Sequence, residues 1–243
     1  MGEVISIISG KGGTGKTTVC AAVASCLAAE GKRVLCIDAD IGLRNLDIAL
    51  GMAELPAIAF TEVLRGEYTL SDAAVHPEFP NLSLLTAPER GEKIDPAAFA
   101  QLLRRAREEY DFCLLDSAAG IGEGFRLATQ AAGRCVIVCT ADPASMRDAA
   151  CTADLLTLRG KQDLCLVVNR VSPRMFSRMA LTVDDIMDTV GVPLLGIVPE
   201  DPEVVLAAAQ GVALVLAAED GAAEACLRIS RRLRGEYIPL MKL

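Results

Sequence analysis

The sequence has a single histidine, and none of its cysteines stands in a C-x-x-C pair. The cysteines are odd in number and scattered through apolar segments. This pattern disfavours a disulfide framework and a metal cluster, and it predicts reduced thiols in the core of a cytosolic protein. They are Cys20, Cys26, Cys36, Cys113, Cys135, Cys139, Cys151, Cys165 and Cys226.

Long apolar runs and an excess of positive charge are also absent. No run approaches the roughly 18 residues that span a bilayer, and the amino terminus has no basic region followed by a cleavage site. We therefore expect a soluble protein that is not exported. The formal net charge of −8 and the pI near 4.8 repel polyanions, so nucleic-acid binding would need a local basic patch.

The chain instead has ample apolar material, 52% of its 243 residues, and only 23% charged residues. Short β-rich runs alternate with longer helical patterns, which is typical of βα units around a mainly parallel sheet. The predicted strands are Val4–Ser9, Arg33–Asp38, Leu82–Thr86, Phe112–Asp116, Cys135–Cys139, Leu164–Asn169 and Leu194–Val198. The predicted helices are Lys16–Glu30, Pro96–Tyr110, Glu123–Ala132, Ser145–Arg159, Val183–Val190, Glu203–Gln210 and Ala222–Arg234.

No low-complexity linker or internal repeat interrupts this alternation. Length alone would fit one large domain or two small ones, and the unbroken pattern predicts one domain over residues 1–243. The expected fold class is α/β, with a mostly parallel twisted sheet and helices on both faces. In such sheets ligands bind at the carboxyl ends of the strands, so the residues that follow each strand carry the functional prediction.

A glycine-rich loop follows the first predicted strand and fits the pattern G-x-x-x-x-G-K-[ST] of a P-loop NTPase. Its backbone N–H groups and the start of the next helix favour phosphate oxygens. The motif's lysine contacts the β- and γ-phosphates, and its threonine supplies a hydroxyl to Mg²⁺. The motif predicts ATP and Mg²⁺ as cofactors. It comprises Gly10, Lys11, Gly12, Gly13, Thr14, Gly15, Lys16 and Thr17, and Thr18 follows it.

Carboxylates follow two other strands. Asp38 and Asp40 end the second strand on the same side of it, and either could cap the next segment. Beside a magnesium triphosphate, such carboxylates hold metal-bound water or orient the attacking water. Asp116 ends an apolar strand, the usual place of an aspartate that binds a metal through water. These positions predict that Thr17 and Asp116 take part in a metal site, and they leave the roles of Asp38 and Asp40 open.

The loop from Ser9 to Thr18, with its second lysine, resembles the deviant Walker A motif of the MinD/ParA ATPase family. The resemblance implies that Lys11 crosses a dimer interface to the partner's nucleotide, and that the ATP-bound state is a homodimer. It also matches Asp40 to the family's catalytic aspartate and Asp38 to the carboxylate near the magnesium ion, which implies a metal site made by Thr17, Asp38 and Asp116. The expected activity is slow, regulatory ATP hydrolysis with Lys11, Lys16 and Asp40 as catalytic residues. Ala118 departs from the family, because it stands where a proline is common.

Two strand ends resemble the family's adenine contacts. Asn169 matches the asparagine that reads the base, since an amide both donates and accepts hydrogen bonds. Pro199 and Asp201 match the second base-contacting loop. Each feature alone is more often a turn than a base reader. Together they favour adenine, because the Asn-Lys-x-Asp guanine signature is absent.

The segment 38–47 resembles the MinD branch, the spatial regulators of the bacterial division site. This resemblance implies a nucleotide-controlled switch with protein partners of MinC/MinE type. It implies a cytoplasmic location, with peripheral binding at the inner face of the cell membrane left open. Pro239 prevents the long carboxyl-terminal amphipathic helix that serves as membrane anchor in the family. Either membrane recruitment is lost, or the chain is truncated.

Two alternatives stay open. The first is a ParA-like DNA-partitioning ATPase, which the net charge disfavours but which the basic stretch from Arg228 to Arg234 would fit. The second is a metabolic P-loop enzyme or an iron–sulphur carrier, of which the carrier should have paired cysteines.

Overall fold

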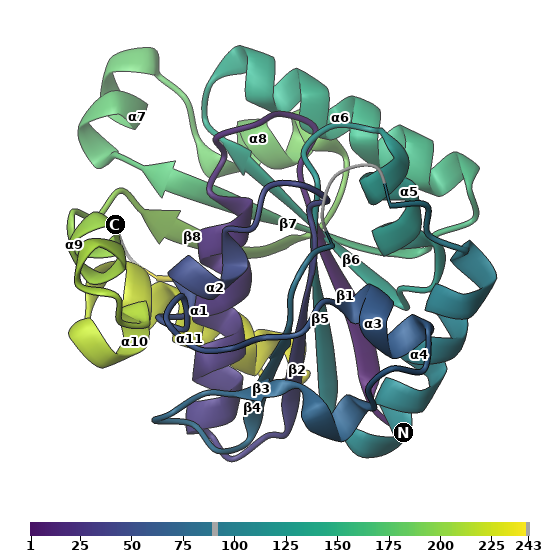
Figure 1. The fold of residues 1–243 in the computed structure, drawn as a ribbon. Coiled ribbons are helices and arrows are strands. Elements are labelled where there is room, and N and C mark those ends of the chain that lie inside the picture. Colours follow the sequence, from purple (N-terminus) through teal and green to yellow (C-terminus); the bar gives the residue numbers. More distant parts are fainter. Residues whose placement is uncertain (89–91, 242–243) are drawn as a thin grey trace.

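The computed structural model describes residues 1–88 and 92–241, and its centre is a twisted eight-stranded sheet (Figure 1). The strands are β1 (Glu3–Ile8), β2 (Val34–Ala39), β3 (Ala74–Val75), β4 (Leu82–Leu85), β5 (Phe112–Ser117), β6 (Arg134–Thr140), β7 (Asp163–Val171) and β8 (Leu194–Pro199). Their order is β3-β4-β2-β5-β1-β6-β7-β8. Within the described part of the chain, β3 and β4 pair antiparallel and the other neighbours pair parallel.

Helices cover both faces of the sheet (Figure 1). One face carries α1 (Lys16–Ala29), α2 (Leu46–Ala49), α9 (Glu203–Gln210), α10 (Leu214–Ala217) and α11 (Gly221–Leu233). The other face carries α3 (Phe60–Leu64), α4 (Pro96–Glu109), α5 (Glu123–Gln130), α6 (Pro143–Leu158) and α8 (Val183–Val190). The remaining helices are the 3₁₀ turn η1 (Leu70–Asp72) and α7 (Pro173–Met179), which lies beyond the carboxyl end of β7.

The side chains of the strands contribute to two hydrophobic cores, one on each face of the sheet. In β1, Val4 and Ile8 pack under α4 and α5, while Ile5 and Ile7 pack under α1. This alternation follows from the two-residue period of a strand, and both sides are apolar because helices cover both faces. The central strands are therefore buried throughout and hold the loops at their carboxyl ends in fixed positions.

The strand order places the glycine-rich loop at the centre of the sheet. Strand β1 lies between β5 and β6, and the chain crosses from one side of β1 to the other between those two strands. Such a reversal of strand order opens a crevice at the carboxyl ends, which is where ligands bind in open α/β sheets. The loops that follow β1, β2, β5, β7 and β8 all begin at this edge of the sheet.

All seven predicted strands and all seven predicted helices are present, with bounds within two residues. The predicted α/β fold is confirmed, and the prediction of one domain over the whole chain stays a prediction. The expectation of nine core thiols is wrong for Cys151, because that position of α6 faces solvent; the other eight cysteines are buried, and all nine are free. No helix in residues 1–88 and 92–241 is both long and apolar enough to cross a membrane.

Candidate functional site

Close packing demands glycine at two positions of the loop between β1 and α1. A Cβ on Gly10 would lie 2.5 Å from the backbone oxygen of Asp148. Gly15, the N-cap of α1, has a φ of 83°, and a Cβ there would lie 2.2 Å from Nδ2 of Asn169. The loop therefore lies directly against α6 and β7, and side chains at these positions would push it away from both.

Lys16 and Thr17, at the start of α1, both contact the carboxylate of Asp116 at the end of β5. Nζ of Lys16 lies 2.5 Å from Oδ1, and Oγ1 of Thr17 donates a 2.6 Å hydrogen bond to Oδ2. The Lys16 and Asp116 side chains are 7% and 1% exposed, so this is a buried ion pair. Burial raises the pKa of Asp116, while the Lys16 charge and the two hydrogen bonds oppose that rise.

Asp38 is also buried, and its carboxylate organises the segment that follows β2. Its oxygens accept hydrogen bonds from the backbone N–H groups of Asp40, at 2.9 Å, and of Asn45 and Leu46, both at 3.3 Å. Burial and the nearby charge of Asp116 raise the pKa of Asp38 to about 7, although the three N–H donors lower it. The capping alternative for Asp38 is thus seen in the structure, and its predicted role near the metal stays a prediction.

Asp40 is half-buried and lines a hollow of about 440 Å³ over the glycine-rich loop. We call this space the loop hollow; residues 12–18, Asp40, Asn45 and Ala119 are among those that line it. Burial raises the pKa of Asp40 from its usual value, and the charge of Lys16 opposes the rise. A carboxylate, an ammonium group and a hydroxyl therefore face one space at the carboxyl ends of β1, β2 and β5.

Lys11 is not among the residues that line the loop hollow. Its Nζ lies 3.2 Å from Oδ1 of Asp142, and its side chain is 44% exposed. Asp142 caps α6 by accepting from the N–H of Ser145, and it also accepts from the hydroxyl of Thr140 at 2.6 Å. The Thr140 bond is the main cause of the lowered pKa of Asp142. Lys11 thus turns away from the loop it belongs to.

A second space, of about 470 Å³, lies beside the loop between β7, β8 and the helices α9 and α11. We call it the Asn169 cavity; Gly15, Thr18, Asn169, Pro199 and Leu214 are among its lining residues. Nδ2 of Asn169 donates a 2.7 Å hydrogen bond to the carbonyl oxygen of Thr14, and Asn169 is buried. This bond joins the cavity to the glycine-rich loop.

Asp201, predicted as an adenine contact, accepts hydrogen bonds with its carboxylate from backbone N–H groups at the starts of two helices. It accepts from the N–H of Glu203 in α9 at 2.9 Å and from the N–H of Ala222 in α11 at 2.8 Å. Two carboxylate–N–H bonds hold both helices against the Asn169 cavity. Asp201 thus shapes the cavity wall, and a direct contact with a base stays a prediction, as it does for Pro199.

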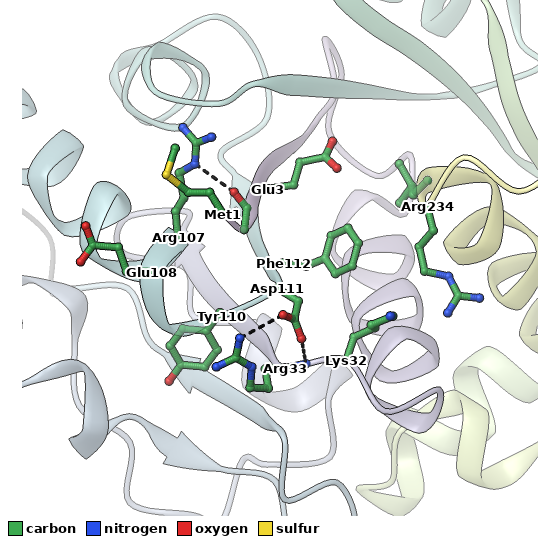
Figure 2. Close-up of a pocket in the computed structure, with 12 residues that line it drawn as sticks. Met1, Glu3, Lys32, Arg33, Arg107, Glu108, Tyr110, Asp111, Phe112 and Arg234 are labelled. Carbon is green, nitrogen blue, oxygen red and sulfur yellow. Dashed lines mark hydrogen bonds and ion pairs between the residues drawn. The ribbon is translucent and has the colours of Figure 1, made fainter.

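Another cavity, of about 430 Å³, opens at the opposite edge of the sheet, where the strands begin (Figure 2). Three of its cationic groups have partners within the chain: Arg33 lies 3.0 Å from Asp111, Arg234 lies 2.7 Å from Glu30, and Arg107 donates to the carbonyl oxygen of Gly2. The glycine-rich loop and the strand-end carboxylates lie at the other edge. The two cavities are similar in volume, but this one lacks the glycine-rich loop and the strand-end carboxylates that make the loop hollow a candidate nucleotide site.

Asp142, Arg170 and Glu200 are contact residues that we did not predict as site residues. Asp142 holds Lys11, while Arg170 and Glu200 pair at 3.2 Å on the wall of the Asn169 cavity. One signal could have identified Asp142: it follows a predicted strand and precedes a proline at a helix start, which marks an N-cap. The Arg170–Glu200 pair joins two strands distant in sequence, and no local pattern indicates it.

The doubly covered parallel sheet, the glycine-rich loop at its centre and the convergent strand-end carboxylates define a P-loop nucleotide-binding protein. Residues 5–215 match the family described as CobQ/CobB/MinD/ParA nucleotide binding domain. The match covers most of the chain, which therefore belongs to this family. The predicted membership of the MinD/ParA ATPases is confirmed.

Known relatives cover nearly the whole chain. The septum site-determining protein MinD of Synechocystis sp. is 36% identical, over 99% of this chain and 92% of its own length. In the MinC:MinD cell division protein complex of Aquifex aeolicus, one chain is 38% identical, with a TM-score of 0.92 over 99% of this chain and 98% of its own. The septum site-determining protein MinD of Pyrococcus horikoshii, complexed with Mg-ADP, is 29% identical, with a TM-score of 0.84 over 96% of each chain.

These relatives confirm the expectation of a nucleotide-binding ATPase that resembles the division-site regulator MinD. The individual roles of the site residues are not tested by the likeness, because identities of 29–38% do not by themselves assign a function to any one side chain.

Proposed function

We propose that this chain is an ATP-switched dimeric ATPase of MinD type, whose nucleotide state controls binding to a protein partner or to a membrane surface. One observation carries the proposal: Lys16, Thr17 and Asp116 form a single contact group beside the loop hollow, into which Asp40 also faces. The triphosphate would lie in this hollow. There the loop N–H groups and Lys16 would bind its oxygens.

The residues around Asp116 suit Mg²⁺. Thr17, Asp38 and Asp116 offer hydroxyl and carboxylate oxygens, the ligand type that Mg²⁺ prefers. The described residues contain no group of three or more His, Cys, Asp or Glu side chains that could enclose a metal. That absence fits an ion held by one or two protein groups, water and substrate phosphates. When bound, the ion would neutralise charge on the phosphates; Thr17 would contact it, and Asp38 and Asp116 would hold its waters.

The base would enter the Asn169 cavity, which joins the loop through the bond from Asn169 to Thr14. Asp40 would orient the attacking water, because phosphoryl transfer depends on positioning and charge more than on a strong base. With Lys11 turned away from its own hollow, the cation that stabilises the transferring phosphoryl group would come from a second copy. Two chains would then complete each site.

We expect Lys11→Ala to bind ATP with an affinity within a few-fold of the wild type and to lose ATP-dependent dimerisation. Hydrolysis should fall by about 10²-fold or more, since a charge supplied in trans stabilises the transition state strongly. Light scattering after gel filtration, with and without ATP, measures the dimer, and phosphate release measures hydrolysis. Lys32→Ala is the matched control, because Lys32 lies at the opposite edge of the sheet.

Mixing variants tests the trans geometry itself. A Lys11→Ala chain keeps its own Asp40, and an Asp40→Ala chain keeps a Lys11 to donate. A mixture should therefore recover hydrolysis that neither variant has alone. A Lys11→Ala variant that dimerises and hydrolyses ATP normally would rule out the trans role.

The basic stretch of α11 does not favour the DNA-binding alternative. Arg228 pairs with Glu224, and Arg231 and Arg234 both pair with Glu30. Arg232 donates to the carbonyl oxygens of Ile238 and Leu194. Three of the four arginines are thus paired with carboxylates, which reduces the positive charge available to attract phosphates, and the net charge is negative.

The residues after α11 fold back onto it. Arg228 donates to the carbonyl oxygen of Pro239 at 3.1 Å, Arg232 donates to that of Ile238 at 2.7 Å, and Met241 packs against the core under α11. Tyr237 is 96% exposed and Leu240 is 36% exposed, so the described part of this segment still presents large side chains to solvent. A membrane contact through this segment would be small, which favours a protein partner of MinC type as the target of the switch.

Parallel sedimentation experiments separate the targets. We expect the protein with ATP to co-sediment with an immobilised MinC-type partner, and to bind anionic liposomes or duplex DNA weakly, with ADP removing the partner contact. The Lys16→Ala variant is the negative control for nucleotide dependence. Strong ATP-dependent sedimentation with duplex DNA would contradict the assignment and support the ParA-like alternative.

A further inference from the structure

Arg170 has an unusual backbone conformation at the edge of the proposed nucleotide site. Its φ is 55°, in the left-handed region that favours glycine, and among the described non-glycine residues it shares a positive φ with Ala180 alone. The pairing of β7 with β8 is irregular at the same place. Val168 pairs with Ile197 and Val171 with Pro199, so β7 takes three steps where β8 takes two. Asn169 and Arg170 thus form a β-bulge.

The bulge separates its two side chains. Asn169 points inward, is buried, and reaches the carbonyl oxygen of Thr14. The Arg170 side chain points to the surface, where it pairs with Glu200; these two side chains are 56% and 57% exposed, so the ion pair contributes little. The N–H of Glu200 donates to the carbonyl oxygen of Val171 at 3.0 Å and closes the bulge.

The bond to Thr14 also fixes which way the Asn169 amide faces. A carbonyl oxygen only accepts, so the atom facing Thr14 is Nδ2, and Oδ1 is the other end of the amide. An acceptor at that end suits the exocyclic amino group of adenine. The exocyclic oxygen of guanine would meet Oδ1 as a second acceptor and be repelled. An amide free to rotate would accommodate either base.

We propose that Arg170 is a positioning residue for base recognition: its left-handed backbone forms the bulge that holds the Asn169 amide in the adenine-selective orientation. This inference rests on the proposed nucleotide site and adds to it the origin of base selectivity. Strained backbone held by its surroundings is concentrated at binding sites, and bulges next to such sites aim side chains.

Three substitutions separate the backbone from the side chain. Arg170→Gly removes the guanidinium and adopts the positive φ freely. Arg170→Ala removes the guanidinium and keeps the backbone constraint of an ordinary residue. Arg170→Val adds a β-branched side chain, which resists the left-handed conformation most strongly. Ala180→Val is the matched control, because Ala180 also has a positive φ but ends α7, away from the Asn169 cavity.

The readouts are the Kd values for ATP, GTP and magnesium tripolyphosphate. Tripolyphosphate reports on the glycine-rich loop without a base. Arg170→Val should weaken ATP binding and lower the ATP-to-GTP preference, each by about tenfold, as expected for one lost oriented hydrogen bond, while tripolyphosphate binding stays within about twofold. Arg170→Gly, Arg170→Ala and Ala180→Val should keep the wild-type preference.

Two results would overturn the inference: Arg170→Val with the wild-type preference, or Arg170→Ala losing as much preference as Arg170→Val. If Arg170→Val does not fold, the thermal unfolding temperatures of Arg170→Gly and Arg170→Ala are compared instead. The inference requires Arg170→Gly to unfold at the higher temperature, and the opposite order overturns it. A failure of the proposed function would give a different result. The wild type would then bind ATP no more tightly than Lys16→Ala does, and the same would hold for tripolyphosphate.

Discussion

Lys16→Ala is expected to abolish ATP hydrolysis and to weaken ATP binding more than any other single change in the loop hollow. Lys16 lines the hollow proposed for the triphosphate, and its charge would strengthen contacts that form in the transition state. We expect hydrolysis to fall on the order of 10³-fold. Isothermal titration with ATP and with tripolyphosphate, together with phosphate release, measures the two effects.

The same substitution should destabilise the protein, because it removes one partner of a buried ion pair. Asp116 is 1% exposed and would keep only the hydrogen bond from Thr17. Loss of a partner from such a pair costs about 3–5 kcal/mol. Without Lys16 the already raised pKa of Asp116 rises further. A carboxyl whose folded pKa is raised makes the protein less stable as the pH rises from its unfolded to its folded pKa. The unfolded reference is shared, so the deficit against wild type should grow once the pH exceeds the raised folded pKa of Asp116 in the wild type.

Lys161→Ala is the matched control for this experiment. Nζ of Lys161 donates to the carbonyl oxygens of Gln130 and Ala132, far along the chain from the loop hollow. Its loss removes the same charge without touching Asp116, so ATP hydrolysis should stay at the wild-type rate. If Lys16→Ala hydrolyses ATP at a rate comparable to this control, the loop hollow is not the nucleotide site.

The fold could be predicted from the sequence to the extent that its elements have a periodicity. Strand β3, the 3₁₀ turn η1 and helices α2, α3 and α10 have two to five residues each, which is too short to show a periodicity, and all five were missed. Helix α7 was missed because its seven residues are fewer than two full turns and begin at Pro173. These short elements are held by tertiary contacts, which override local propensity.

The proximity of candidate site residues could be predicted where each residue comes directly after a strand, because the carboxyl ends of parallel strands lie at one edge of the sheet. That rule predicted that Lys16, Thr17, Asp40 and Asp116 lie close together. In the structure Lys16, Thr17 and Asp40 line the loop hollow, and Asp116 contacts Lys16 and Thr17 beside it. The rule could not show how the carboxylates are used. The oxygens of Asp38 accept hydrogen bonds from backbone N–H groups, and those of Asp201 accept from backbone N–H groups at the starts of two helices. Such bonds depend on the loop and helix geometry of the folded chain.

Asp40→Ala is expected to leave ATP binding within a few-fold of wild type and to lower kcat by about 10²- to 10³-fold. Asp40 lines the loop hollow without taking part in the contact group of Lys16, Thr17 and Asp116. Its carboxylate would orient the attacking water, and a positioned group of this kind contributes about 10²–10⁴-fold. Asp47→Ala is the matched control, because Asp47 accepts from the N–H of Ile48 and does not line the loop hollow.

The pH dependence distinguishes a role in the reaction from a structural role of Asp40. Burial raises the pKa of Asp40, so its carboxylate should protonate at a higher pH than an ordinary aspartate, and kcat should fall along that acid limb. Asp40→Asn removes the charge but keeps an oxygen that accepts hydrogen bonds, so its residual activity should not show this limb. An Asp40→Ala variant that hydrolyses ATP at the wild-type rate would exclude the assignment. Another group would then have to orient the water.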